Sequence, residues 1–379
     1  MRRTALLTLL LSITICTRSA AADGDTPGLV RFIHKLAAHI DSATTRGTDP
    51  RYLTAPEKPW QLIVRGNVTE TELKMKSTID GSAIFTNVIG DMHWEPRIKT
   101  DPTFYTGFWA GYRGYGVGYS KNFCGDKGSL ITIGATGGAY GVNVRLHRYE
   151  SDEPEVHFVG YTPQREEYTE RMQLEEPIKV HVLTLDAFYY LNGKRFSYSA
   201  AYDQSVIQLR SAGSFVVGAM YYYGRASYEQ DRNAYFMLLM NDIGRMQHWQ
   251  AGITLGYAYN WVPARGWLVS AMAIPLLTLF NRVRTYHYDS NLRQLAYDDN
   301  IYEDNQLPSV NDWKVSQSEV ITENGGIRLS MNARFSLTYQ WRNLFLNANG
   351  QFYRFGYHAD RQKGRLVDWN VNTSIGVRF

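Results

Sequence analysis

Nine ionisable side chains lie at alternate positions in stretches that have the pattern of β-strands, on what would be the polar face of each strand. They are Arg65, Arg145, His147, Lys179, His181, Arg328, Arg334, Asp368 and Arg378. Guanidinium groups gathered along one wall can bias a pore toward anions. The same groups can pair with carboxylates and fill a narrow interior. Carboxylates are scarcer than arginines on these stretches, which favours a positive lumen. The alternative, a structural interior in which loop carboxylates form salt bridges with these cations, is equally consistent with the sequence.

The sequence assigns no catalytic residue and no metal or cofactor site. His147, His181 and His248 lie on or near strand-like stretches, but no spacing matches a hydrolytic triad and no nucleophile elbow is present. The acidic stretch YDDNIYEDN at residues 297–305 has enough carboxylates for calcium, yet its spacing does not match a calcium loop, and a solvated loop is preferred. Gly114, Gly116 and Gly118 share one face, where they either remove bulk or relieve strain in a curved sheet.

The element that must carry these side chains is clearest at the end of the chain, in residues 364–379. Apolar Val367, Trp369, Val371, Ile375 and Phe379 alternate there with polar or small residues. Strict period-2 alternation indicates an extended strand with one apolar and one polar face. An ordinary strand has about five or six residues. A longer strand with one apolar face is typical of a transmembrane barrel.

Similar stretches recur from residue 60 onward and predict an all-β fold, a transmembrane antiparallel β-barrel of about twelve strands. The predicted strands are residues 60–68, 104–113, 115–122, 130–149, 178–190, 196–202, 213–224, 248–261, 267–280, 326–341, 344–357 and 364–379. If the first and last strands both begin or end in the periplasm, the short links fall on the periplasmic side and most long links on the external side, as in known barrels. The long link 150–177 breaks this rule, so it is a strand extension or an extra hairpin that would change the count by two.

Aromatic residues and composition agree with a membrane barrel. Trp249 and Trp261 lie toward the two ends of one predicted strand, where aromatic girdles meet the membrane interfaces. The chain contains 27 Tyr and 32 Gly, and 44% of its residues are hydrophobic. The formal net charge of +4 falls to +1 without Arg2, Arg3 and Arg18, which gives no reason to expect nucleic acid as a partner.

The first 22 residues have the pattern of a cleavable signal peptide, with Arg2 and Arg3 before a short apolar core and small residues at 19–22. The apolar run is shorter than the roughly 20 residues of a membrane helix. Residues 23–59 are expected to form a periplasmic segment with an amphipathic helix over 27–42. Packing on the barrel rim is favoured over a plug inside the lumen. After cleavage Cys124 is the single cysteine, so no internal disulfide is expected.

Several motifs resemble a known family. They are WQLIVRGNV at 60–68, GYRGYGVGYS at 111–120, RLHRY at 145–149, FSYSAAYDQ at 196–204, SAGSF at 211–215, YNWVPARGWL at 259–268 and the closing DWNVNTSIGVRF. Together they are similar to an uncharacterised outer-membrane β-barrel family of Bacteroidetes-type bacteria, known only as a domain of unknown function. The resemblance spans about residues 60–379. The resemblance implies an outer-membrane location and a barrel topology. It implies no activity and no catalytic residue.

These observations predict an exported protein of a Gram-negative outer membrane, with residues 60–379 as a porin-like barrel. The function expected first is passive or facilitated passage of a small polar solute. The alternatives are a surface-interaction or structural barrel with a closed lumen and, less favoured, a lipid-modifying enzyme. The expected partners are outer-membrane lipid and the barrel-assembly machinery, which would bind the strand ending at Phe379. The sequence does not identify the substrate.

Overall fold

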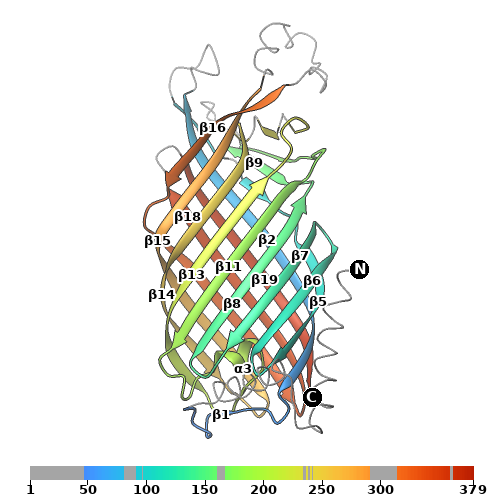
Figure 1. Cartoon of the computed structure of the whole chain (residues 1–379), viewed down its shortest axis with the longest axis vertical. Helices are drawn as coiled ribbons and strands as arrows, with labels where there is room; N and C mark the ends of the chain where they lie inside the picture. Colours follow the sequence, from blue (N-terminus) through green and yellow to red (C-terminus); the bar gives the residue numbers. More distant parts are fainter. Residues whose placement is uncertain are drawn as a thin grey trace, which may run out of the picture.

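The wall of the molecule is one antiparallel sheet that closes on itself into a tall barrel (Figure 1). The computed structural model describes residues 47–80, 91–95, 97–159, 167–233, 236–237, 240, 242–290, 314–358 and 362–379. The signal peptide, the predicted helix at 27–42 and the acidic stretch at 297–305 lie outside these residues.

Twelve of the described strands form the wall, and each pairs with its neighbours along the chain until β19 pairs with β2. They are β2 (Trp60–Asp80), β5 (Thr103–Tyr112), β6 (Tyr115–Cys124), β7 (Lys127–Thr136), β8 (Tyr140–Ser151), β11 (Ile178–Tyr190), β13 (Ala212–Ser227), β14 (Ile243–Trp261), β15 (Trp267–Ser290), β17 (Arg328–Trp341), β18 (Leu344–His358) and β19 (Gln362–Arg378). This arrangement confirms the predicted all-β, twelve-stranded antiparallel barrel.

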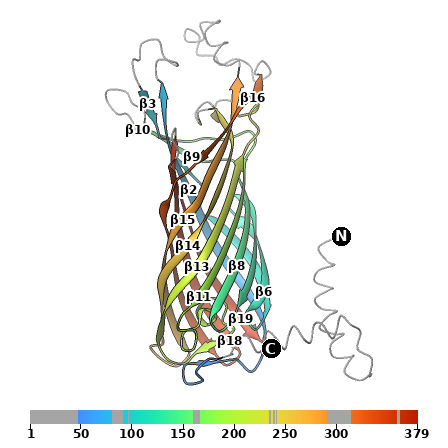
Figure 2. The same cartoon turned by 60° about the vertical axis from the view of Figure 1, so that its left-hand side comes forward.

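The remaining described elements lie at the two ends of the barrel (Figure 2). They are β1 (Leu53–Thr54), β3 (Asp91–Trp94), β4 (Arg97–Lys99), β9 (Glu155–Val159), β10 (Glu167–Arg171), α3 (Tyr198–Tyr202), β12 (Ile207–Gln208) and β16 (Val315–Asn324). We call the end with β1, α3 and the C-terminus the turn end, because its wall strands are joined by short turns such as 342–343. The opposite end, with β3, β9, β10 and β16, is the loop end. No helix in the described part of the chain has the length and apolarity to cross a bilayer.

Alternating side chains explain why these strands form a barrel in a membrane. On β2, Leu62 and Val64 are exposed on the outer face while Gln61 and Ile63 are buried inside. On β14, Leu255 is 61% exposed outside and Thr254 is 0% exposed inside. An apolar exterior around a largely polar interior is the inverse of a soluble barrel and is typical of outer-membrane barrels.

The structure corrects two strand predictions, and the two errors cancel in the strand count. Residues 130–149 belong to two strands, β7 and β8, separated by a turn around Gly137 and Gly138. Residues 196–202 are not a strand, because Ser197 caps the short helix α3 by accepting a hydrogen bond from the N–H of Ala200. With the extra strand in place, the link 150–177 emerges at the loop end, where it forms the hairpin of β9 and β10.

The glycines on β6 make room for one aromatic ring in the lumen. A Cβ atom on Gly116 would lie 2.2 Å from the indole of Trp109, and one on Gly118 would lie 2.9 Å from it. Trp109 is 5% exposed and packs with Ile63 and Phe345. These glycines therefore remove bulk so that a neighbouring side chain can fill the lumen, which is the first of the two roles considered for them.

Candidate functional site

The inward faces of the wall strands collect six of the nine side chains singled out in the sequence. Burial alternates along each strand, and this alternation places them in the lumen. The six are Arg65 on β2, Arg145 and His147 on β8, Arg334 on β17, and Asp368 and Arg378 on β19.

Lys179 and His181 differ from that expectation, because they lie on the outer face of β11. The inward residues of β11 are the even-numbered ones, including Val180, Val182 and the buried Asp186. Toward the loop end this strand has its apolar side chains inside and its cations outside, so a polar face could not be equated with the lumen.

Arg328 also differs from the expectation. It occupies a position of β17 whose alternation would point it inward. Because it is the first residue of that strand, its side chain is exposed to solvent.

The middle of the lumen holds a polar chamber of about 140 Å³. Its lining includes Trp109 and Ile63, but most of the remaining lining side chains carry amides, hydroxyls or charges. The amide-bearing residues are Asn143, Gln204, Asn347, Asn349, Gln351, Asn370 and Asn372. Several are joined in a ladder, since Asn372 Nδ2 donates to Asn370 Oδ1 at 3.0 Å and to Asn349 Oδ1 at 3.1 Å. Such a surface offers both donors and acceptors to a small polar molecule.

A second chamber of about 110 Å³ lies toward the loop end and is mainly apolar. Val180, Val182, Leu366, Phe355 and Tyr222 are among the residues that line it. Its polar lining residues include His147, His248 and Asp368.

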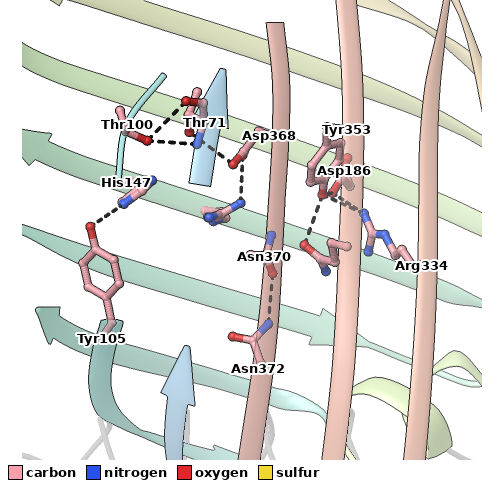
Figure 3. Close-up of polar contacts among 12 residues, drawn as sticks. Thr71, Thr100, Tyr105, His147, Asp186, Arg334, Tyr353, Asp368, Asn370 and Asn372 are labelled. Atoms are coloured by element: carbon pink, nitrogen blue, oxygen red, sulfur yellow. Dashed lines mark hydrogen bonds and ion pairs between the residues drawn. The ribbon is translucent and has the colours of Figure 1, made fainter. Parts of the chain in front are cut away.

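An ion pair joins a residue of one chamber to a residue of the other (Figure 3). Arg145 lines the polar chamber and donates to Asp368, which lines the apolar chamber, with 3.3 Å between Nη1 and Oδ2. Thr71 Oγ1 donates to the other carboxylate oxygen of Asp368 at 3.4 Å. Nearby, the hydroxyl of Tyr105 and Nε2 of His147 are 2.9 Å apart. A solute passing from one chamber to the other would have to pass this polar group.

A second ion pair connects distant strands across the polar chamber (Figure 3). Arg334 Nη2 donates to Asp186 Oδ2 at 2.5 Å, and the hydroxyl of Tyr353 donates to the same oxygen at 3.2 Å. Arg334 Nη1 donates to the hydroxyl of Tyr198 at 2.8 Å, and its guanidinium lies 5.0 Å from the ring centre of Phe188. Both charged side chains are almost fully buried and belong to one polar network. Within it, Asp186 Oδ1 has no hydrogen-bond partner among the described residues.

Arg65 has no such counter-charge. Its Nη1 donates to Thr132 Oγ1 at 3.1 Å, and no carboxylate of the described residues forms an ion pair with it. It lines the polar chamber together with Arg145, whose Nη2 has no hydrogen-bond partner among the described residues, as is also true of Asn370 Nδ2. Three donor groups, two of them cationic, therefore line the same chamber. Two carboxylates, Asp186 and Asp203, line the chamber as well, and Asp186 Oδ1 has no partner among the described residues. Buried donors without partners are costly, so the three donor groups favour an anionic or carbonyl-bearing occupant on their side of the chamber.

The turn end of the lumen is closed by the link between β11 and β13, which folds inward and carries α3. Side chains of the wall donate to main-chain oxygens of this link. Ser336 Oγ and Asn347 Nδ2 donate to the carbonyl of Ala201 at 2.6 and 3.0 Å. Arg378 Nη2 and Gln61 Nε2 donate to the carbonyl of Gln204 at 2.7 and 2.8 Å. Of these donors the sequence analysis singled out Arg378. Its partner was missed because residues 196–202 were predicted to be a strand of the wall.

The same link carries an acidic group, Asp203. Thr136 Oγ1 donates to its Oδ2 at 2.5 Å, and the N–H of Ser205 donates to its Oδ1 at 2.9 Å. Burial raises the pKa of Asp203 to about 6, and the nearby charge of Arg378 opposes this shift.

The loop end is covered by an apolar cluster. Met75, Val156, Ile178, Phe236 and Met240 are buried against one another there, with Met172 and Leu174. In this structure the two chambers therefore lie between two closures. The closure at the turn end combines hydrogen bonds with apolar packing of Phe196, Ala200 and Ala201, and the closure at the loop end is apolar.

The sequence missed Asp186 and Tyr353, although both lie on alternating strands. Asp186 lies in an otherwise apolar stretch of β11, and an isolated acidic residue inside a barrel strand was the available signal. Among the described residues no group of three or more His, Cys, Asp or Glu side chains is arranged to hold a metal ion.

A family model described as Domain of unknown function (DUF4421) matches residues 72–379. Among solved structures, the chain resembles the outer membrane protease OmpT from Escherichia coli, with 6% identity, a TM-score of 0.39, and coverage of 86% of this chain and 97% of that one. The outer membrane protein OprG from Pseudomonas aeruginosa gives 10% identity, a TM-score of 0.27, and coverage of 86% and 98%. The P. putida toluene transporter TodX gives 12% identity, a TM-score of 0.29, and coverage of 86% and 91%.

At these identities and TM-scores no activity transfers from these barrels, and no curated protein matches the chain. The expected resemblance to a domain of unknown function is confirmed, while its assignment to one group of bacteria stays a prediction. Because the family model covers most of the sequence, this protein belongs to the family described as Domain of unknown function (DUF4421).

Proposed function

We propose that this protein is an outer-membrane barrel that facilitates the passage of a small polar solute carrying an anionic group. The turn end would face the periplasm and the loop end the outside, as in other single-chain barrels. The solute would bind in the polar chamber and leave after the link between β11 and β13 moves.

The observation that carries this proposal is the uncompensated guanidinium of Arg65 in a chamber lined by amides. Arg65 is half-buried and has one neutral partner. A charge that is partly withdrawn from water without a counter-charge is costly, which supports a role for Arg65 in binding an anion. A carboxylate could accept hydrogen bonds from Arg65 and from Arg145 Nη2. A cavity of about 150 Å³ can hold benzene, which bounds the solute at roughly six heavy atoms.

The closures at both ends are compatible with a gated route. The closure at the turn end depends on hydrogen bonds from wall side chains to the link, each of which contributes about 1 kcal/mol net. It also depends on apolar packing of Phe196, Ala200 and Ala201 against the wall. The link is covalently joined to the wall through β11 and β13, and its strand β12 pairs with β1 outside the wall. Its undocking would therefore break no pairing between wall strands. The apolar chamber would receive the less polar part of the solute.

The second candidate function is a barrel whose lumen stays closed and whose loops bind a partner. The apolar cluster at the loop end favours it, because Met75, Val156 and Phe236 are buried there like residues of a structural core. No observation favours a lipid-modifying enzyme.

The proposal includes the predicted route to the membrane. Residues 1–22 would act as a cleavable signal peptide, and residues 23–59 would remain in the periplasm. The final strand β19, followed by Phe379, would be recognised by the barrel-assembly machinery. The support for this is that β19 closes the barrel on β2, with Phe379 N–H donating to the carbonyl of Trp60 at 3.1 Å.

The test is solute flux into proteoliposomes containing the refolded chain. Lactate, a three-carbon carboxylate, should enter faster than glycerol, which has the same number of carbon atoms and no charge. Arg65→Gln should lower lactate entry roughly tenfold, the loss expected for a hydrogen bond to a charged group, and leave glycerol entry unchanged.

The matched control is Arg354→Gln, which removes an exposed arginine from β18. It should leave both fluxes unchanged. Equal entry of lactate and glycerol in the wild type would overturn the anion preference, and no entry of either solute would favour the closed barrel.

A further inference from the structure

A basic patch lies on the outer face of the barrel, away from the lumen and near the loop end. We call it the basic belt, and it consists of Arg148, Lys179, His181, Arg225, Arg245 and Arg284. These residues come from five consecutive wall strands, β8, β11, β13, β14 and β15.

Strand register brings the belt into two neighbouring rows. In the first row Arg148 is opposite His181, and His181 is opposite Arg225. This row continues through Gln247 to Arg284. In the second row Lys179 is opposite Ser227, which is opposite Arg245. Directly opposed side chains lie about 5 Å apart at Cβ, so the belt is continuous.

The belt contains one carboxylate for six basic side chains. None of its six members forms an ion pair with a described residue. The one carboxylate in these rows, Glu150, lies opposite Lys179 in the row nearer the loop end. On the far side of the wall the pattern is different, because cations there are paired. Glu72 pairs with Arg97 at 3.0 Å and with Lys74 at 3.3 Å, and Glu70 pairs with Lys99 at 3.6 Å. Arg148 and Arg225 both lie opposite His181, with no carboxylate between them. An anionic group outside the barrel would relieve the repulsion among these basic side chains.

The row below the belt marks the edge of the apolar exterior. There Leu146, Leu183, Tyr223 and Trp249 follow one another across four strands. The guanidinium of Arg284 lies 5.5 Å from the ring of Trp249, and that of Arg245 lies 4.9 Å from the ring of Tyr286. Aromatic rings at this position mark a membrane interface, so the belt lies at the level of lipid headgroups.

We propose that the basic belt is a binding site for the phosphate groups of a lipid in the surrounding leaflet at the loop end. Arginine offers a planar pair of donors that matches phosphate oxygens, and the rings hold two guanidinium groups in place. The acyl chains of the lipid would lie on the leucines and aromatic side chains of the row below. The site is independent of the lumen, so it stands whether or not the barrel conducts.

The test is native mass spectrometry of the refolded full chain in mixed micelles of phosphatidic acid and phosphatidylcholine. Phosphatidic acid carries a phosphate monoester and phosphatidylcholine does not. The wild type should retain phosphatidic acid in preference to phosphatidylcholine. The variant Arg148→Gln/His181→Gln/Arg225→Gln/Arg284→Gln should lose that preference by roughly tenfold or more, since each cation near a surface contributes about 1 kcal/mol.

The matched control replaces the paired cations, as Lys74→Gln/Arg97→Gln/Lys99→Gln. It removes nearly as much charge and should keep the preference. Inorganic phosphate at equal concentration should not displace the lipid, because it lacks the acyl chains.

Three results would overturn the proposal. They are equal retention of both lipids by the wild type, an equal loss in the control, or complete displacement by inorganic phosphate. If the fourfold variant does not refold, the wild type is measured at increasing salt concentrations instead. The proposal requires its preference for phosphatidic acid to fall as salt screens the belt, and an unchanged preference would overturn it.

Discussion

Individual arginines in the lumen have different roles because their neighbours differ. Arg334 is bonded to Asp186 and Tyr198, so its charge is used within the protein. Arg65 has a single neutral partner, Thr132. Arg145 is intermediate, with one nitrogen on Asp368 and one without a described partner. The polar lumen is therefore a structural network with two guanidinium groups available to a solute.

Removing the partner of Arg334 should destabilise the barrel. Asp186→Ala would leave a fully buried guanidinium unpaired, and we expect the free energy of unfolding to fall by about 3 kcal/mol or more. The measurement is urea unfolding of the refolded chain, followed by its heat-modifiable migration. Arg334→Met combined with Asp186→Leu should recover most of the loss, because no buried charge would remain. An unchanged unfolding midpoint for Asp186→Ala would show that the pair does not stabilise the barrel.

The sequence predicted the lumen better near its middle than near the loop end. Alternation placed Arg65, Arg145 and Arg334 on polar faces, and these faces point inward. It misplaced Lys179 and His181, because β11 continues beyond the apolar band and there has its valines inside. The ion pairs could not be predicted, since Arg334 and Asp186 are 148 positions apart in the chain and meet only when the barrel closes.

At the scale of elements, the link that carries α3 decides whether the lumen is open. Its sequence FSYSAAY alternates as a strand does, which explains the wrong prediction for 196–202. Phe196, Ser197 and Ala200 are all buried, because this part of the link is surrounded by the wall. Alternation of apolar and polar residues cannot identify an element that is buried on all sides. The capping residue Ser197 was the usable signal.

Asp203 should make the docking of this link depend on pH. In the docked link its pKa is about 6, whereas in an undocked, hydrated link it would return to its usual value of about 3.9. The docked state thus binds its proton more tightly. Its stability is complete below about pH 4 and falls as pH rises through 4 to 6, so channel openings should be more frequent at pH 7.5 than at pH 5.

Single-channel recording at the two pH values checks this prediction. Asp203→Asn should remove most of the change between them. A variant that keeps the full pH dependence would show that Asp203 is not its cause and would assign the effect to other titratable groups.

At the scale of the whole molecule, the twelve-stranded wall was predictable because its length and alternation repeat along the chain. The count was right although two elements were wrong, since one predicted strand proved to be two and another proved to be α3. With these corrections the described ends of the long links lie at the loop end, apart from the inward-folded link at 191–211. This asymmetry supports an orientation with the loop end outside.

Cys124 provides a direct test of that orientation. It is an exposed, free cysteine at the loop end of β6. A bulky, membrane-impermeant maleimide added to intact cells should label it, and Cys124→Ser should not be labelled. In the Cys124→Ser background, Arg342→Cys at the turn end should react only after the cells are opened. The reverse labelling pattern would invert the proposed topology.

The most direct test of a gated lumen is the ionic current through one refolded barrel in a planar bilayer. The wild type should show brief, infrequent openings. A variant in which residues 194–210 are replaced by a short Gly-Ser linker should show steady openings with a preference for anions, because the closure at the turn end is gone. A folded, heat-modifiable variant that stays silent would contradict the account and leave the barrel with a permanently closed lumen.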